Sequence, residues 1–87
     1  MKILYVEDNA QDADLVRRAF ARQEADAVLE VVDSLALAWT CLSGNCDYDV
    51  VLADLRLPDG SGLELLAQVR MRALPCAVVV LTGSGDQ

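Results

Sequence analysis

The chain has 87 residues, 54% of them hydrophobic, which is enough for the core of one small domain and too few for a second. Its net charge of −7 argues against direct binding to nucleic acid or to an anionic membrane, because both need basic surfaces. The chain contains no histidine, which excludes a catalytic dyad or a zinc site that depends on imidazole.

The location of the protein is predicted from what the sequence lacks. No apolar run is long enough to span a membrane, and the first residues do not have the pattern of a signal peptide. The three cysteines, Cys41, Cys46 and Cys76, are odd in number and lack the paired spacing of a zinc site. We therefore expect reduced, buried or partly buried thiols and a cytoplasmic protein.

The first strand is predicted at residues 2–6, and residues 8–23 follow it with the spacing of an amphipathic helix. Asn9 is the expected N-cap, because its side chain can accept hydrogen bonds from the first turn. The apolar residues expected on one face of this helix are Ala13, Val16 and Phe20.

Residues 28–32 predict a second strand, and Glu30 in its middle indicates an edge strand with one solvated face. Ser34 is the expected cap of a second helix that runs to about Leu42, with Gly44 as its terminator.

The third strand is predicted at residues 48–54, and its uninterrupted apolar run at 50–53 is typical of a strand covered on both faces. Residues 61–64 read Ser-Gly-Leu-Glu, a capping-box pattern that opens a third helix. The residues expected to face inward from that helix are Leu63, Leu66 and Val69. A fourth, wholly apolar strand is predicted at residues 76–82.

The alternation of four strands with three helices predicts an α/β fold with a parallel sheet and helices on both faces. The whole chain is expected to form a single domain over residues 1–87. One feature is unusual, because a domain rarely ends directly after a strand of the buried type. We therefore expect a truncated domain.

Acidic side chains follow two of the predicted strands. Glu7 and Asp8 come after the first strand, Asp54 ends the third, and the hydroxyl of Thr82 ends the fourth. The carboxyl ends of parallel strands meet at one edge of the sheet, where ligand sites form. Three carboxylates that meet at this edge repel one another and need a counterion. Mg²⁺ suits them because it takes one or two carboxylates and keeps several waters.

Each acidic feature also has an ordinary structural interpretation. An acidic pair after a strand is often a helix cap or a solvated loop, and an aspartate before a Pro-Asp-Gly turn is often turn chemistry. The joint pattern of acids after two strands and a hydroxyl after a third favours a functional site.

Three segments carry a family resemblance: "ILYVEDN" at residues 3–9, "YDVVLADLRLPDGSGLELL" at 48–66 and "VVVLTG" at 78–83. With these motifs the chain resembles the receiver domain of bacterial two-component response regulators, the CheY-like domains. The resemblance implies a flavodoxin-like, doubly wound parallel sheet with strand order 2-1-3-4, lacking the last helix–strand–helix segment.

The resemblance also implies roles for the site residues. Asp54 would be the phosphoacceptor of a phosphorelay, receiving its group from a sensor histidine kinase or a phosphotransfer protein. Glu7, Asp8 and Asp54 would hold Mg²⁺ together with the backbone carbonyl of Arg56. Thr82 would contact the phosphoryl group and act as the switch. Such a domain is a signalling module, not an enzyme in the usual sense.

Two departures from the family stand out. Its members place a lysine at the end of a fifth strand, whereas the only lysine here is Lys2, in the first predicted strand. Without a fifth strand, the edge of the fourth strand at residues 76–81 is unpaired. We therefore expect this edge to support a homodimer.

Other functions remain open. A phosphorylation-independent interaction module on the same fold is the main alternative. A metal-dependent phosphohydrolase of the haloacid-dehalogenase type is disfavoured, because Glu7-Asp8-Asn9 is not its D-x-D-G-T-like run. A P-loop nucleotidase is not supported, because the chain has no G-x-x-x-x-G-K-[ST] run. The arginines of the first helix can dock a kinase or simply form a solvated face: Arg17, Arg18 and Arg22.

Overall fold

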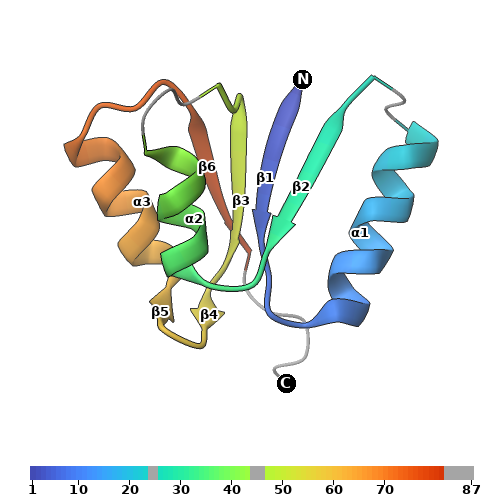
Figure 1. The fold of residues 1–87 in the computed structure, drawn as a ribbon, viewed down its shortest axis with the longest axis horizontal. Helices are drawn as coiled ribbons and strands as arrows, with labels where there is room; N and C mark the ends of the chain where they lie inside the picture. Colours follow the sequence, from blue (N-terminus) through green and yellow to red (C-terminus); the bar gives the residue numbers. More distant parts are fainter. Residues whose placement is uncertain (24–25, 44–46, 82–87) are drawn as a thin grey trace.

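The computed structural model describes residues 1–23, 26–43 and 47–81. At its centre is a four-stranded parallel sheet in the order β2-β1-β3-β6 (Figure 1). Because β6 is the fourth of the predicted strands, the predicted order 2-1-3-4 and the doubly wound α/β class are confirmed. The strand bounds are β1 Lys2–Val6, β2 Val28–Val32, β3 Val50–Asp54 and β6 Ala77–Leu81.

The helices form a layer on each face of the sheet, as predicted. Helix α1 lies on one side, and α2 and α3 lie together on the other (Figure 1). Their bounds are α1 Ala10–Gln23, α2 Leu35–Leu42 and α3 Gly62–Met71. A two-residue antiparallel hairpin between β3 and α3, β4 Arg56–Leu57 with β5 Gly60–Ser61, was not predicted from the sequence.

Helix α1 begins where the sequence predicts. The Asn9 side chain accepts hydrogen bonds at 2.9 and 3.1 Å from two backbone N–H groups of the first turn, which confirms it as the cap. Ala13 is buried against the sheet, while Val16 and Phe20 on the same face are half-buried. Leu15 points away from this face and is 62% exposed.

Helix α2 is capped at both ends by serine. The Ser34 hydroxyl accepts a hydrogen bond from the Leu37 N–H at 3.2 Å, as predicted. At the other end the Ser43 N–H donates to the Trp39 carbonyl at 2.9 Å, and the predicted terminator Gly44 lies outside the described residues. The buried residues of this helix are Leu35, Ala38 and Leu42.

Strand β3 is fully covered on only one face. Val51 and Ala53, which face α2 and α3, are completely buried, whereas Val50 and Leu52 on the opposite face are half-buried. The predicted cover is therefore complete on one face and partial on the other. The reason is that α1 packs at the β2 side of its face and does not reach across to β3 (Figure 1).

Helix α3 is rotated relative to the prediction. Leu65 and Val69 are buried, Leu66 is half-buried, and Leu63, which was expected to face inward, is 55% exposed. The inward face therefore follows the spacing of Leu65 and Val69, and the prediction for Leu63 is wrong.

Gly62 explains this rotation. A Cβ atom at Gly62 would lie 2.5 Å from the backbone carbonyl oxygen of Asp54, so only glycine allows the first turn of α3 to lie this close to the end of β3. With Gly62 against the strand, the helical period brings Leu65 to the same face.

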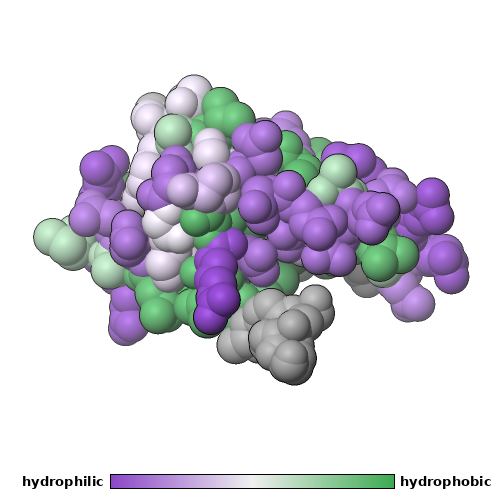
Figure 2. Space-filling view, turned by 90° about the horizontal axis from the view of Figure 1, so that it is seen from below, coloured by the Kyte–Doolittle hydropathy of each residue, from purple (hydrophilic) through white to green (hydrophobic). Residues whose placement is uncertain are grey.

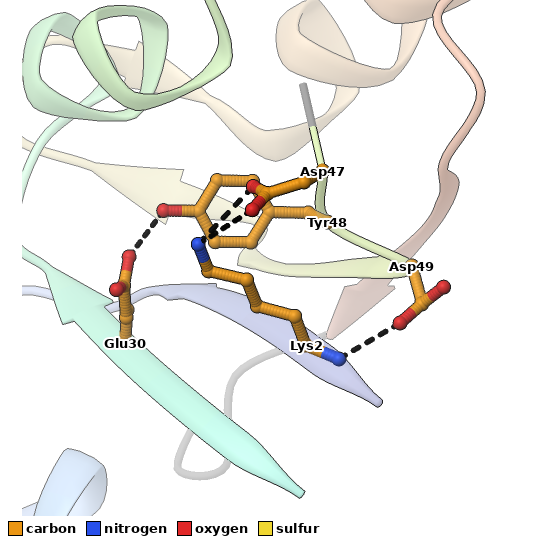
Figure 3. A network of polar contacts seen from close by, with 5 residues as sticks. All are labelled: Lys2, Glu30, Asp47, Tyr48 and Asp49. Carbon is orange, nitrogen blue, oxygen red and sulfur yellow. Dashed lines mark hydrogen bonds and ion pairs between the residues drawn. The ribbon is translucent and has the colours of Figure 1, made fainter. Parts of the chain in front are cut away.

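The N-terminal rim of the sheet is held by a polar network around Lys2 (Figure 3). The Lys2 amine lies 3.0 Å from the Asp47 carboxylate and 4.8 Å from the centre of the Tyr48 ring. The Tyr48 hydroxyl donates to Glu30 on β2, and the Lys2 N–H donates to Asp49 at 2.8 Å. This network connects β1, β2 and the segment before β3. Strand β2 lies at the edge of the described sheet, as predicted from Glu30 in its middle.

Within the described ranges, no helix combines the length and the hydropathy needed to cross a membrane. Cys41 and Cys76 are half-buried, as expected for partly buried thiols. Cys46 lies outside the described residues.

Candidate functional site

Three of the predicted site residues come together at the carboxyl edge of the sheet. One carboxylate oxygen each from Glu7, Asp8 and Asp54 lies within 4.8 Å of the others. Strands β1 and β3 are neighbours with Val6 opposite Ala53, so the residues that follow this pair in each strand meet at the edge. Figure 2 looks onto this edge, and hydrophilic side chains cover most of its α1 half.

The three carboxylates differ in their surroundings. Glu7 is 5% exposed and is the one buried charged residue in the described part of the chain, Asp54 is half-buried, and Asp8 is exposed. The Glu7 carboxylate accepts two hydrogen bonds of 3.1 Å, from the Tyr5 hydroxyl to Oε1 and from the Asn9 N–H to Oε2. The cluster therefore has a fixed inner acid and a solvated outer one.

Burial shapes the protonation of this cluster. Burial raises the pKa of Glu7, the charge of Asp54 raises it further, and the hydrogen bond from Asn9 opposes both. Burial likewise raises the pKa of Asp54, and the charge of Asp8 adds to this effect. The cluster thus favours either bound protons or a bound cation, and its oxygen-only ligands suit a hard divalent ion.

The hairpin after Asp54 connects the site to α2. Asp59 at its turn accepts hydrogen bonds from the Leu35 N–H at 2.8 Å and from the Ala36 N–H at 3.0 Å, and these bonds lower the pKa of Asp59. Sequence reasoning missed this contact, because Asp59 lies in a Pro-Asp-Gly run that reads as an ordinary turn. Arg56 is exposed at the start of β4, close along the chain to Asp54.

A cavity of about 390 Å³ opens beside the acidic cluster, between α1 and the end of β2, and both Glu7 and Asp8 line it. Its wall includes Arg17, whereas Arg18 pairs with Asp14 at 2.9 Å. All three arginines of α1 are exposed: Arg17, Arg18 and Arg22. Their exposure is compatible with both a docking surface and a solvated face.

Two other predicted features can be placed. Thr82 lies outside the described residues. Lys2 begins β1, and Glu7 follows the end of that strand, so a strand length of about 16 Å separates them. Lys2 is engaged with Asp47 at the far rim and is not a neighbour of Asp54.

A family model described as the response regulator receiver domain matches residues 3–87. This chain belongs to that family. The receiver domain is 34% identical over 70 residues to a chemotaxis protein CheY homolog of Campylobacter jejuni. This alignment covers 80% of this chain and 53% of that protein. It is 38% identical over 86 residues to the transcriptional regulatory protein CutR of Streptomyces coelicolor, and this alignment covers 99% of this chain and 38% of CutR. The chain spans about half the length of the CheY homologue.

The receiver fold is also found among solved structures. A MaeR response regulator bound to beryllium trifluoride superimposes with a TM-score of 0.87 at 24% identity. The match covers 99% of this chain and 70% of MaeR. At this identity the likeness shows the fold.

Proposed function

We propose that this receiver domain accepts a phosphoryl group on Asp54, with Mg²⁺ held at the same site. The observation that carries the proposal is the meeting of Glu7, Asp8 and Asp54 at the ends of two adjacent parallel strands in a chain of the receiver family. The related MaeR fold was solved with beryllium trifluoride bound. A donor that fits the family is a sensor histidine kinase or a phosphotransfer protein.

The side chains present suit Mg²⁺. They offer oxygen ligands alone, and two of the three carboxyls have raised pKa values that a cation would offset. In this proposal Glu7, Asp8 and Asp54 hold the ion, and the backbone carbonyl of Arg56 is a further ligand. When bound, Mg²⁺ supplies positive charge next to the transferring phosphoryl oxygens.

Asp54 is well placed to act as the nucleophile. It ends a strand that is paired on both sides, it lies opposite Leu81 of β6, and Gly62 packs against its carbonyl. One carboxylate oxygen of Asp54 forms a bond to phosphorus as the bond from phosphorus to the donor's histidine nitrogen breaks. The product is an aspartyl phosphate that stays covalently attached to the domain, so the proposed role is signalling and not the turnover of a substrate. Thr82 is the proposed contact for the new phosphoryl oxygens and the proposed switch.

The proposal extends to partners and compartment. Family membership supports a phosphorelay in the cytoplasm, with a kinase or a phosphotransfer protein as donor. A second copy of the chain is the other proposed partner, through the edge of β6, which has β3 on one side alone within the described sheet.

One observation favours the alternative, an interaction module that works without phosphorylation. Lys2, the only lysine of the chain, is engaged at the opposite rim and is not available to a phosphoryl group on Asp54.

Intact-mass spectrometry after incubation with Mg²⁺ and a small-molecule phosphodonor tests the proposal. The native chain should gain one phosphoryl group, and Asp54→Asn should gain none. Asp33→Asn is the matched control, because this exposed acid lines the neighbouring cavity and has no proposed role in transfer. Absence of any adduct on the native chain would favour the alternative, and an adduct on Asp54→Asn would place the acceptor elsewhere.

A further inference from the structure

Tyr5 is a buried polar residue next to the acidic cluster. It is 2% exposed, and its hydroxyl donates to Glu7 Oε1 at 3.1 Å. Tyr5 and Glu7 are two residues apart along β1 and its extension, so their side chains lie on the same face. A buried hydroxyl costs free energy unless it is hydrogen-bonded, and here the partner is the one buried carboxylate of the described chain.

The hydrogen bond restricts a flexible side chain. Glutamate has one more rotatable bond than aspartate, so holding its carboxylate in one place costs more conformational entropy. The Asn9 N–H holds Oε2 and the Tyr5 hydroxyl holds Oε1, which restrains both ends of the Glu7 carboxylate. Each oxygen has two lone pairs, so each keeps one acceptor position for another ligand.

We infer that Tyr5 is a positioning residue that orients the Glu7 carboxylate toward the cation site shared with Asp8 and Asp54. Tyr5 acts through Glu7 and need not touch the ion. Hydrogen bonds of this kind to a metal-ligating side chain set its orientation and commonly affect metal affinity. The inference rests on the proposed Mg²⁺ site and gives a role to Tyr5, to which the family resemblance assigned none.

The chain contains its own control. It has two tyrosines, and each donates a hydrogen bond to a glutamate. Tyr48 pairs with Glu30 beside Lys2, at the rim opposite the acidic cluster (Figure 3). Removing either hydroxyl deletes the same chemical group from a buried tyrosine, but Tyr5 alone belongs to the site.

Isothermal titration with Mg²⁺ compares the native chain, Tyr5→Phe and Tyr48→Phe. Tyr5→Phe should bind Mg²⁺ about tenfold more weakly, whereas Tyr48→Phe should bind as the native chain does. Equal affinity in the native chain and Tyr5→Phe would overturn the inference and leave the proposed function intact. No binding to the native chain would overturn both.

A double-mutant cycle separates positioning from a general structural role. If Tyr5 acts through Glu7, Tyr5→Phe should have no further effect on Mg²⁺ affinity in a Glu7→Gln background. If the hydroxyl only supports the fold, the same substitution should weaken binding equally in both backgrounds, and that result would contradict the inference.

A spectroscopic measurement leaves Tyr5 unchanged and so does not depend on how Tyr5→Phe folds. In Tyr48→Phe, Tyr5 is the only tyrosine, and a cation bound at Glu7 changes the field at its hydroxyl. Mg²⁺ should then produce a tyrosine difference absorption spectrum that saturates with the binding curve. Binding without this spectral change would mean that Tyr5 is not linked to the ion through Glu7.

Discussion

The surroundings shift the pKa values of the acidic residues at the carboxyl edge of the sheet in opposite directions. Burial raises the pKa values of Glu7 and Asp54, whereas two backbone N–H donors lower the pKa of Asp59. In the absence of a cation, the charged forms of Glu7 and Asp54 are therefore disfavoured in the folded chain, whereas the charged form of Asp59 is favoured. When no cation is bound, the charges of Glu7 and Asp54 reduce the stability of the fold, whereas the charge of Asp59 increases it.

Asp54→Asn should raise the free energy of unfolding at pH 7 without divalent cations, because the charged form of Asp54 is disfavoured by burial in the folded chain. The pKa of Asp54 is higher in the folded chain than in the unfolded chain, so the folded state binds more protons between these values. The free energy of unfolding of the native chain therefore falls as pH rises through that window. Urea denaturation at several pH values measures the difference, which should vanish at pH 3.

Mg²⁺ provides the control for this effect. The ion should stabilise the native chain and close most of the gap to Asp54→Asn, because a ligand that binds the folded state raises the free energy of unfolding. A gap that is independent of both pH and Mg²⁺ would contradict the argument from charge.

Asp59→Ala should lower the urea midpoint of unfolding, because two N–H groups at the start of α2 lose their acceptor. The pKa of Asp59 is lowered by folding, so its contribution is present above the ordinary aspartate value and is lost as pH falls toward the folded value. Asp33→Ala removes an acid beside the same helix end as a control. Equal shifts for the two variants would mean that charge alone, and not the two hydrogen bonds, stabilises this end.

At the scale of the elements, β3 is central and β6 lies at the edge of the described sheet. This difference explains the exposures of two valines in the two strands. Val51 in β3 is completely buried between α2, α3 and the sheet, whereas Val79 in β6 is 45% exposed.

Val51→Ala should therefore lower the free energy of unfolding by about 1–3 kcal/mol, from lost apolar burial and a partial cavity. Val79→Ala deletes the same two methyl groups and should cost less than half as much, because its side chain is already partly in water. Chemical denaturation of both variants gives the comparison. Similar costs would mean that β6 is covered as completely as β3 in solution.

Much of the fold was predictable because several local signals agreed. Strand lengths, helix spacing and the caps Asn9 and Ser34 indicated the same alternation of elements, and parallel topology then brought the acids at residues 7, 8 and 54 to one edge. The roles of those acids stay predictions, as does the role of Thr82.

The remaining features depend on contacts between segments far apart along the chain. The rotation of α3 follows from Gly62 packing on the Asp54 carbonyl, whereas a sequence with leucines at 63, 65 and 66 fits more than one face. Asp59 caps a helix that begins 24 residues earlier. Tyr5 reads as one more apolar residue of a buried strand until its hydrogen bond to Glu7 is seen.

At the scale of the whole molecule, the edge of β6 is the surface proposed to pair with a second copy of the chain. The Ala77 N–H donates to Asp49 and the Leu81 carbonyl accepts from Leu55, so alternate residues of β6 bond to β3. The backbone groups of Val78 and Val80 therefore point away from β3, toward the open side of the sheet. This edge offers a strand-pairing surface.

We expect a dimer at micromolar concentration, formed by antiparallel pairing of two β6 edges about a twofold axis. Light scattering on a size-exclusion column measures the mass. Val80→Pro should give a monomer, because proline removes an outward N–H without disturbing the bonds to β3. A native chain that elutes as a stable monomer would contradict the prediction.

The network around Lys2 also has a practical consequence for studying the molecule. Lys2 is the only lysine of the 87 residues, and the hydrogen bond from its amine to Asp47 raises its pKa. A reagent that couples to lysine therefore attaches at the rim opposite the acidic cluster, and an alkaline buffer is needed to deprotonate the amine. A sensor surface coupled this way would hold the molecule by that rim, with the edge that carries Glu7, Asp8 and Asp54 turned toward the solution.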